Sequence, residues 1–330
     1  MSKIDPHGIT WFTIFLSLIL LFFSFASQGV DKEKKEETEN PEQAESSYFL
    51  TYPGKRAASL FLSSPSVTVD ASNEVSGKDL RLQTNSHPLM GPGYVTQSFS
   101  IKPEFLKLPV SDSSKGDTKD FHLGFDYFPR NSSVYFEGKY NWSQGFYLEN
   151  SGDFEPGKSY ILYPDLRSII AVLEALYVRS ADKLSISAAK GGIERQLKST
   201  WSWVGLFGIQ YIDLSSNQSH ANLDLSFHEV KQGSVHAMGG ISGVWVYQYF
   251  YALGEFDAGP MVYYQTLNLE KKFSSSGIQL ATRILVSFGL DFDSFSLFVA
   301  GENIQNSVVR KNGSLSVQLN EGRSGLSYRF

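Results

Sequence analysis

The sequence predicts an all-β fold: a single antiparallel transmembrane β-barrel of about 12 strands, within a range of about 10 to 14. Three observations predict this fold. From residue 48 onward, apolar or aromatic residues recur at every second position along successive long stretches. Aromatic residues gather at the ends of those stretches, and apolar and polar residues also alternate along the last stretch up to Phe330.

Composition removes several other classes of protein. The 330 residues include no cysteine, which excludes a disulfide-stapled module, a thiolate metal site and a cysteine nucleophile. A mean hydropathy of -0.19 does not fit a bundle of transmembrane helices, each of which needs about 20 apolar residues. Aromatic residues at 14% beside charged residues at 19% argue against a disordered chain.

The N-terminal part of the sequence predicts a targeting signal followed by a leader. An apolar run from Trp11 to Ala26 has small residues at Ser24 and Ala26, so we predict a signal peptide over residues 1–26; an uncleaved anchor is the alternative. Residues 27–47 then form a charged, flexible leader, and residues 48–330 form the β-barrel domain. The leader holds most of the net charge of -5, and the remaining chain has no basic stripe, so we expect no nucleic-acid partner.

The predicted strands follow the alternating stretches, with turns at Gly, Asn, Ser, Asp or Pro. One row is Phe121, Leu123, Phe125 and Tyr127, and the Pro129–Ser132 turn separates it from the next. Segments 66–71, 79–84 and 220–228 remain open as extra strands or hairpin loops. We predict strands over residues 56–63, 93–101, 119–128, 132–142, 166–179, 182–197, 200–212, 235–252, 255–269, 276–291, 294–304 and 314–330.

The segment 166–179 also fits a helix, because six apolar residues share one helical face and Asp165 could cap it. As a strand, it directs Ile169, Leu173 and Tyr177 toward lipid and Glu174 toward the lumen. We favour the strand because residues 180–182 form a turn into the alternating apolar residues that follow. The choice between helix and strand stays open at this point.

Alternation alone does not separate a soluble sandwich from a membrane barrel. The stretches 235–251 and 276–291 are longer than soluble strands, which average about 5–6 residues. Tyr and Trp at strand ends are typical of the membrane interface. Leu326, Tyr328 and Phe330 resemble the C-terminal signal by which outer-membrane barrels are recognised for assembly. We therefore expect a location in the cell outer membrane, with outer-membrane lipid and the barrel-assembly machinery as partners.

Polar residues on predicted inner faces form the candidate lumen cluster. We interpret it as a salt-bridge lattice that stiffens the barrel, and a binding or conduction site is the alternative. Its members are Glu194, Gln196, Lys198, Arg283, Glu174 and Asp291.

The sequence predicts no catalytic, cofactor-binding or metal-binding residues. None of His87, His122, His220, His228 and His236 stands in a His-x-Ser motif like that of barrel lipid hydrolases, and no third ligand is spaced to close a metal site at His228 and His236. We expect no enzyme and no cofactor.

Several short blocks resemble the bacterial family designated domain of unknown function 4421. They are residues 48–62, 144–150, 183–187, 194–199 and the Trp201-Ser-Trp203 motif. The resemblance covers most of the chain from about residue 48, and it implies a signal-bearing outer-membrane protein of barrel type. It brings no activity and no catalytic residues.

The functional expectation is an outer-membrane β-barrel of a Gram-negative bacterium, non-enzymatic, with a channel role or a structural and interaction role. One alternative is a barrel-embedded lipid-modifying hydrolase. The other is a soluble periplasmic or surface β-protein.

Overall fold

The computed structural model describes residues 47–52, 55–73, 78–109, 112–129, 132–149, 160–190, 193–216, 229–268, 272–310 and 313–330. The predicted signal peptide, nearly all of the predicted leader and the segment 220–228 lie outside the described residues. Among the residues described, no helix is long and apolar enough to cross a membrane.

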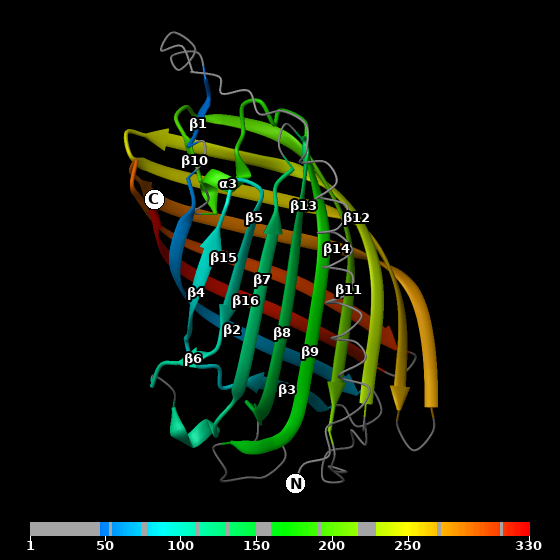
Figure 1. Cartoon of the computed structure of the whole chain (residues 1–330). Helices are drawn as coiled ribbons and strands as arrows, with labels where there is room; N and C mark the ends of the chain where they lie inside the picture. Colours follow the sequence, from blue (N-terminus) through cyan, green and yellow to red (C-terminus); the bar gives the residue numbers. More distant parts are fainter. Residues whose placement is uncertain are drawn as a thin grey trace. The chain divides into compact units, whose positions relative to one another are not determined.

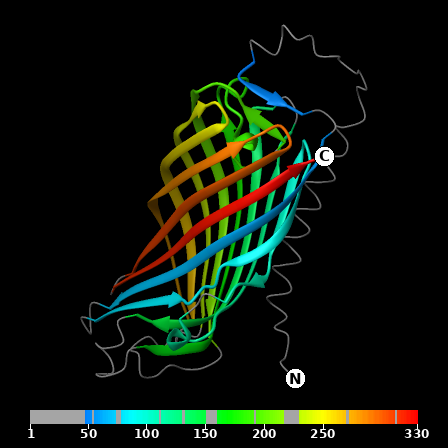
Figure 2. The ribbon, with the colours of Figure 1, turned by 90° about the vertical axis from the view of Figure 1, so that its left-hand side faces the viewer.

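The described chain forms one large antiparallel sheet that closes on itself (Figures 1 and 2). The wall strands are β2 (Ala57–Asn73), β3 (Lys78–Thr84), β4 (Leu89–Val95), β5 (Phe99–Glu104), β7 (Lys119–Tyr127), β8 (Val134–Leu148), β9 (Ile161–Val178), β11 (Thr200–Ser215), β12 (Glu229–Tyr247), β13 (Phe250–Asn268), β14 (Lys272–Asp291), β15 (Phe295–Arg310) and β16 (Gly313–Arg329). Shorter elements are β1 (Phe49–Thr51), β6 (Leu106–Lys107), the 3-10 turn η1 (Ser113–Lys115), α3 (Ile186–Ala189) and β10 (Glu194–Gln196).

Closure depends on β2, which pairs with the last strand, β16, over its whole length. On its other edge, the first half of β2 pairs with β4 and the second half pairs with β3. One ring therefore runs through β4, β5 and β7 to β8, and near the opposite end a shorter path runs through β3 to β8. A closed ring has no free sheet edge, which excludes the sandwich and fits the predicted barrel of about 12 strands.

Gly145 marks the point at which β8 changes partner. Before this residue β8 pairs with β7, and after it β8 pairs with β3. The register against β9 shifts between Gln144 and Phe146, and Gly145 has a φ of 100°, a conformation that favours glycine. A Cβ at this position would lie 2.6 Å from the carbonyl oxygen of Asp117.

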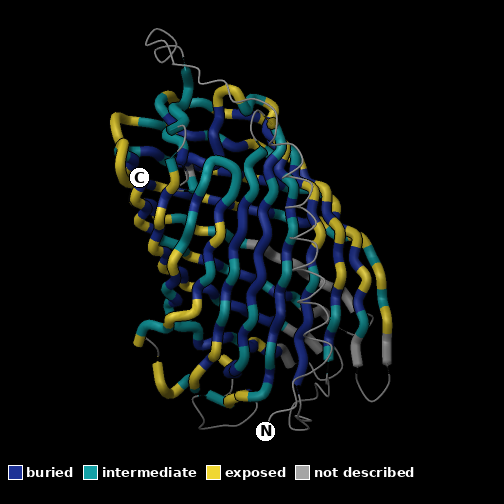
Figure 3. Tube along the Cα trace, viewed as in Figure 1, coloured by how far each residue is buried: buried dark blue, intermediate teal, exposed yellow. Residues whose placement is uncertain are grey.

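Buried and exposed residues alternate along many of the wall strands (Figure 3). The exposed outer positions are mostly apolar, whereas the buried inner positions include the polar and charged residues as well as apolar ones. In β14, Ile278 and Leu280 are 75% and 71% exposed, whereas Arg283 on the opposite face is 1% exposed. Gln210 and Gln279 face inward, as the barrel prediction requires. The orientation of β9 also agrees with the strand interpretation of 166–179, since Tyr177 is exposed and Glu174 is buried.

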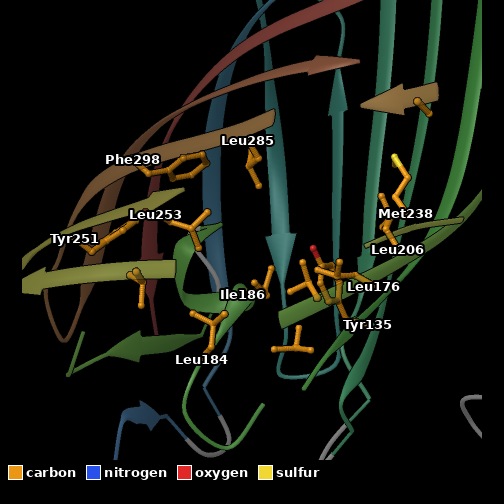
Figure 4. Close-up of a cluster of buried hydrophobic side chains, with 14 of the residues drawn as sticks. Tyr135, Leu176, Leu184, Ile186, Leu206, Met238, Tyr251, Leu253, Leu285 and Phe298 are labelled. Carbon is orange, nitrogen blue, oxygen red and sulfur yellow. The ribbon is translucent and has the colours of Figure 1, made fainter. Parts of the chain in front are cut away.

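Two large apolar clusters of the described residues occupy the lumen, and a third, small one contains Ala57, Val95 and Ile193. The first packs inward-facing residues of β2, β3, β8, β9, β11, β12 and β16 near the end where β2 finishes, and it includes Val69, Leu166 and Val317. The second lies nearer the end where β16 finishes, which we call the C-terminal end (Figure 4). In the second cluster Leu184 and Ile186, which do not belong to the wall, pack with wall residues such as Leu253 and Phe298.

Leu184 and Ile186 belong to residues 179–199, which connect β9 to β11 and which we call the plug segment. The prediction of a strand over 182–197 is wrong, because this stretch contains α3 and the short β10. Residues 184–188 are all buried, so both alternating sets face protein and no lipid-facing row exists. The Ser185 hydroxyl caps α3 by accepting a hydrogen bond from the Ala188 N–H at 3.0 Å, and β10 pairs with β1 instead of a wall strand.

Other strand predictions differ in their bounds. The predicted strand 93–101 is two strands, β4 and β5, because the Thr96 hydroxyl accepts hydrogen bonds from Ser98 N–H and Phe99 N–H and turns the chain. Segment 66–71 is the second half of β2, and 79–84 belongs to β3. The remaining predicted strands are present, most of them longer at one or both ends.

Candidate functional site

The centre of the lumen between the two large apolar clusters holds a group of buried or nearly buried charges that pair with one another. We call it the central charge lattice. Its members are Lys102 on β5, Asp126 on β7, Glu137 and Lys139 on β8, Glu174 on β9, Lys190 after α3, Glu255 on β13, Arg283 on β14 and Glu302 on β15.

Arg283 is the hub of the lattice. Its guanidinium lies 2.9 Å from Glu302, 3.3 Å from Glu137, 3.5 Å from Glu174 and 3.6 Å from Glu255. These four carboxylates come from four different strands, so one planar donor group joins distant parts of the wall. Because these groups are buried, losing any one of the pairings would lower the stability of the folded barrel, since an unpaired charge in the interior is strongly destabilising.

Three lysines offset most of the remaining acidic charge, so that the five carboxylates of the lattice face four cations. Lys139 contacts Glu137 at 3.3 Å and also contacts Glu302, while Lys102 lies 2.8 Å from Asp126. Lys190 lies 2.6 Å from Glu137 and 3.7 Å from Asp126, so the plug segment contributes a cation to the lattice. Burial alone would lower the pKa of Lys190, but the carboxylates of Glu137 and Asp126 outweigh it and leave that pKa raised. Lys190 therefore holds the plug segment in the lumen as a charged anchor.

A cavity of about 40 Å³ adjoins the lattice under the plug segment. Lys102, Glu137, Lys190 and Glu302 line its polar side, and Ile186, Leu253 and Phe298 are among the residues on its apolar side. This volume holds a few water molecules at most.

The structure brings together only part of the predicted lumen cluster. Arg283 and Glu174 lie in the lattice, 3.5 Å apart. Asp291 faces inward but pairs with Arg329 at 2.7 Å, at the C-terminal end of β14.

The other three predicted cluster members, Glu194, Gln196 and Lys198, lie in the plug segment and not on a wall strand. Glu194 accepts a hydrogen bond from Ser185, Gln196 accepts one from the Ser185 N–H at 2.9 Å, and Lys198 is exposed. Placing these residues on a lumen face was wrong because the stretch that carries them is not a wall strand.

Sequence reasoning missed most of the lattice. Glu137, Lys139, Glu255 and Glu302 stand opposite the lipid-type rows of their strands, so a systematic assignment of both faces would have marked them as inward. Lys190 carries no such signal, since only the tertiary placement of the plug segment brings it to Glu137.

Known structures with some similarity to this chain are outer-membrane barrels. The outer membrane protease OmpT from Escherichia coli has a TM-score of 0.42 at 12% identity, covering 85% of this chain and 98% of its own. The translocator domain of the autotransporter NalP from Neisseria meningitidis has a TM-score of 0.38 at 9% identity, covering 97% and 98%. The toluene transporter TodX of Pseudomonas putida has a TM-score of 0.28 at 9% identity, covering 84% and 90%. At these values the fold assignment rests on the strand pairing of this chain itself.

Comparison with curated proteins gives no match. A family profile, in contrast, matches residues 43–330, which include the whole described barrel and all the blocks of the sequence resemblance. The chain belongs to the family described as domain of unknown function (DUF4421).

Proposed function

We propose that this protein is an outer-membrane β-barrel of a Gram-negative bacterium with a closed lumen, and that it acts as a structural or interaction protein. The single observation that carries the proposal is the arrangement of polarity: a closed wall with an apolar exterior surrounds a paired, buried charge lattice. Exposure of such an apolar exterior to water is unfavourable, whereas its contact with lipid is favourable.

The exterior aromatic residues support a membrane location. Trp201, Trp203, Trp245, Tyr247 and Tyr328 all lie exposed near the C-terminal end, where β11 begins and β12 and β16 end. Amphipathic aromatic side chains at one end of the wall fit the interface between lipid tails and head groups. Leu326 and Tyr328 lie exposed on the outer face of the last strand and Phe330 follows it directly, also exposed, so all three are available to the barrel-assembly machinery during insertion.

The packed lumen favours a structural or interaction role over a channel. Apolar clusters lie on either side of the lattice, and the plug segment packs inside the lumen with the second of them. The cavity beside the plug segment has a volume of about 40 Å³, far below the roughly 300–1,000 Å³ of a small-molecule site. Water-filled porins need larger barrels with open polar lumens.

The contacts of the described histidines are consistent with a non-enzymatic role. A barrel hydrolase of the serine type needs a histidine hydrogen-bonded to the serine whose proton it takes. Among the described residues, His87 contacts the carbonyl oxygen of Leu108 and the Asp117 carboxylate, His236 contacts Glu174 at 3.2 Å, and the ring nitrogens of His122 make no hydrogen bond, so none of these three histidines is bonded to a serine hydroxyl.

Fractionation and conductance test this proposal. The full chain should stay in the outer-membrane fraction after carbonate washing, and it should migrate faster on gels before boiling than after boiling. Purified protein in planar bilayers should show no steady conductance. Extraction into the soluble fraction without detergent would contradict the membrane location. A stable open conductance would contradict the closed lumen and support a channel role.

A further inference from the structure

A second buried group of polar side chains lies beside the central charge lattice, at the seam where β2 joins the first and last parts of the barrel. Glu104 ends β5, His122 lies opposite it on β7, and Glu321 comes from β16. One ligand atom from each of the three residues lies within 4.8 Å of the other two. All three are buried, with Glu104 fully enclosed and His122 only 2% exposed.

His122 is the side chain of the three that lacks a partner. Among the described residues, neither of its ring nitrogens makes a hydrogen bond, and Glu104, which also makes none, is held by an ion pair of its Oε1 with Arg323. A buried imidazole nearly always has a partner, because leaving it unsatisfied forfeits its hydration without compensation. Its free nitrogens lie beside two carboxylates, which points to a shared ligand.

The local charges favour a cation. Arg323 lies 3.3 Å from Oε1 of Glu104 and also contacts Oε1 of Glu321, so it fixes both carboxylates through one oxygen each. Two carboxylates and one guanidinium leave one negative charge uncompensated if His122 is neutral. Lys102, the next nearby cation, is already paired with Asp126 at 2.8 Å. The Oε2 atoms of Glu104 and Glu321 remain available to a positive ligand.

We propose that Glu104, His122 and Glu321 bind a divalent transition-metal ion of the Zn²⁺ type. One imidazole nitrogen and two carboxylate oxygens form a mixed donor set that suits such ions. Glu321 also lines the cavity of about 40 Å³, which is large enough to hold water beside this ligand. Arg323 acts as the outer partner that orients both carboxylates.

The ion would brace the barrel at its seam. In the wall, β16 is separated from β5 and β7 by β2 and β4. Coordination would therefore link β16 to β5 and β7, two strands with which β16 has no backbone pairing. This link would hold the first and last parts of the domain together.

Metal binding is tested on the untagged full chain, folded in detergent and equilibrated with Zn²⁺ before exhaustive dialysis. We expect one Zn²⁺ per chain by elemental analysis, and a Co²⁺-loaded sample should show ligand-field absorption. His122→Ala should lower Zn²⁺ affinity at least about tenfold in competition with a chelating dye. His87→Ala is the matched control, because His87 lies outside the cluster, and it should bind Zn²⁺ as the wild type does.

Glu104→Gln keeps the side-chain volume and covers the case in which His122→Ala fails to fold. It should also lower Zn²⁺ affinity at least about tenfold, with heat-modifiable gel mobility retained. Absence of stoichiometric Zn²⁺ and Co²⁺ from the folded wild type would overturn the proposal and leave a protonated carboxyl group as the partner of His122. Unchanged affinity in folded Glu104→Gln would overturn it as well. Metal content is measured without reference to the membrane, so this outcome is independent of the proposed function.

Discussion

At the scale of single residues, Arg283 shows how strongly the lumen depends on paired charge. Arg283→Ala leaves four buried carboxylates without their shared cation, and we expect it to lower the free energy of unfolding by about 3–5 kcal/mol. Arg81→Ala is the control, because Arg81 pairs with Asp70 on the surface, where the loss should be below about 1 kcal/mol. Urea titration of the folded protein in detergent measures both. Equal losses would show that the lattice contributes little.

Gly145 carries a second prediction at this scale. Its φ of 100° and the nearby carbonyl oxygen of Asp117 leave no place for a side chain, so Gly145→Ala should destabilise the barrel by about 1–3 kcal/mol. Gly205→Ala is the matched control, since a Cβ there meets nothing within 4 Å and the residue lies in a regular strand. The same urea titration compares the two variants. A neutral Gly145→Ala would mean that β8 changes partner without needing the positive φ.

At the scale of elements, the plug segment should respond to pH through Glu194. Burial raises the pKa of Glu194, although the Ser185 and Thr51 hydroxyls oppose the shift. The folded segment therefore holds the proton more tightly than the unfolded one, so this contribution to stability is full below the unfolded pKa and is lost as the pH rises through the folded pKa. Glu194→Gln should raise protection of the plug-segment amides at neutral pH and remove this pH dependence.

Hydrogen exchange checks the Glu194 prediction, with protection factors corrected for the intrinsic rate at each pH. The amide of Tyr52, which donates to the carbonyl oxygen of Ile193, reports on the β1–β10 contact. Amides of β14 serve as the internal control and should not respond. Protection that is the same in wild type and Glu194→Gln at every pH would contradict the assignment.

The elements also show where pattern analysis succeeds. Strands β7, β11 and β14 agree with their predicted ranges, because each has lipid-type residues on one face and polar or small residues on the other. The same pattern analysis wrongly predicted a wall strand in the plug segment. Leu184, Ile186 and Ala188 alternate with serines, yet all five residues of 184–188 are buried inside the lumen. A period of two indicates a wall strand only where one side of the chain meets lipid.

At the scale of the whole molecule, closure of the lumen should not depend on the plug segment alone. Replacing residues 182–197 by a short Gly-Ser linker removes Leu184, Ile186 and Lys190, but it leaves the apolar cluster at the opposite end intact. We expect this variant to remain heat-modifiable and to show no steady conductance in planar bilayers. A stable open conductance from the variant, but not from the wild type, would instead make the plug segment a gate.

The sequence by itself determined the fold class of the barrel, most wall strands and the inward direction of Arg283, Glu174 and Asp291, because a period of two with an apolar outer row is a local property. Only the tertiary structure decided which inward residues meet. Glu137, Glu174, Glu255 and Glu302 lie on four strands, and they converge on Arg283 because the closed wall brings distant positions to the same depth. The place of the plug segment was likewise decided by packing inside the lumen. Such contacts depend on strand register and closure, which no local pattern encodes.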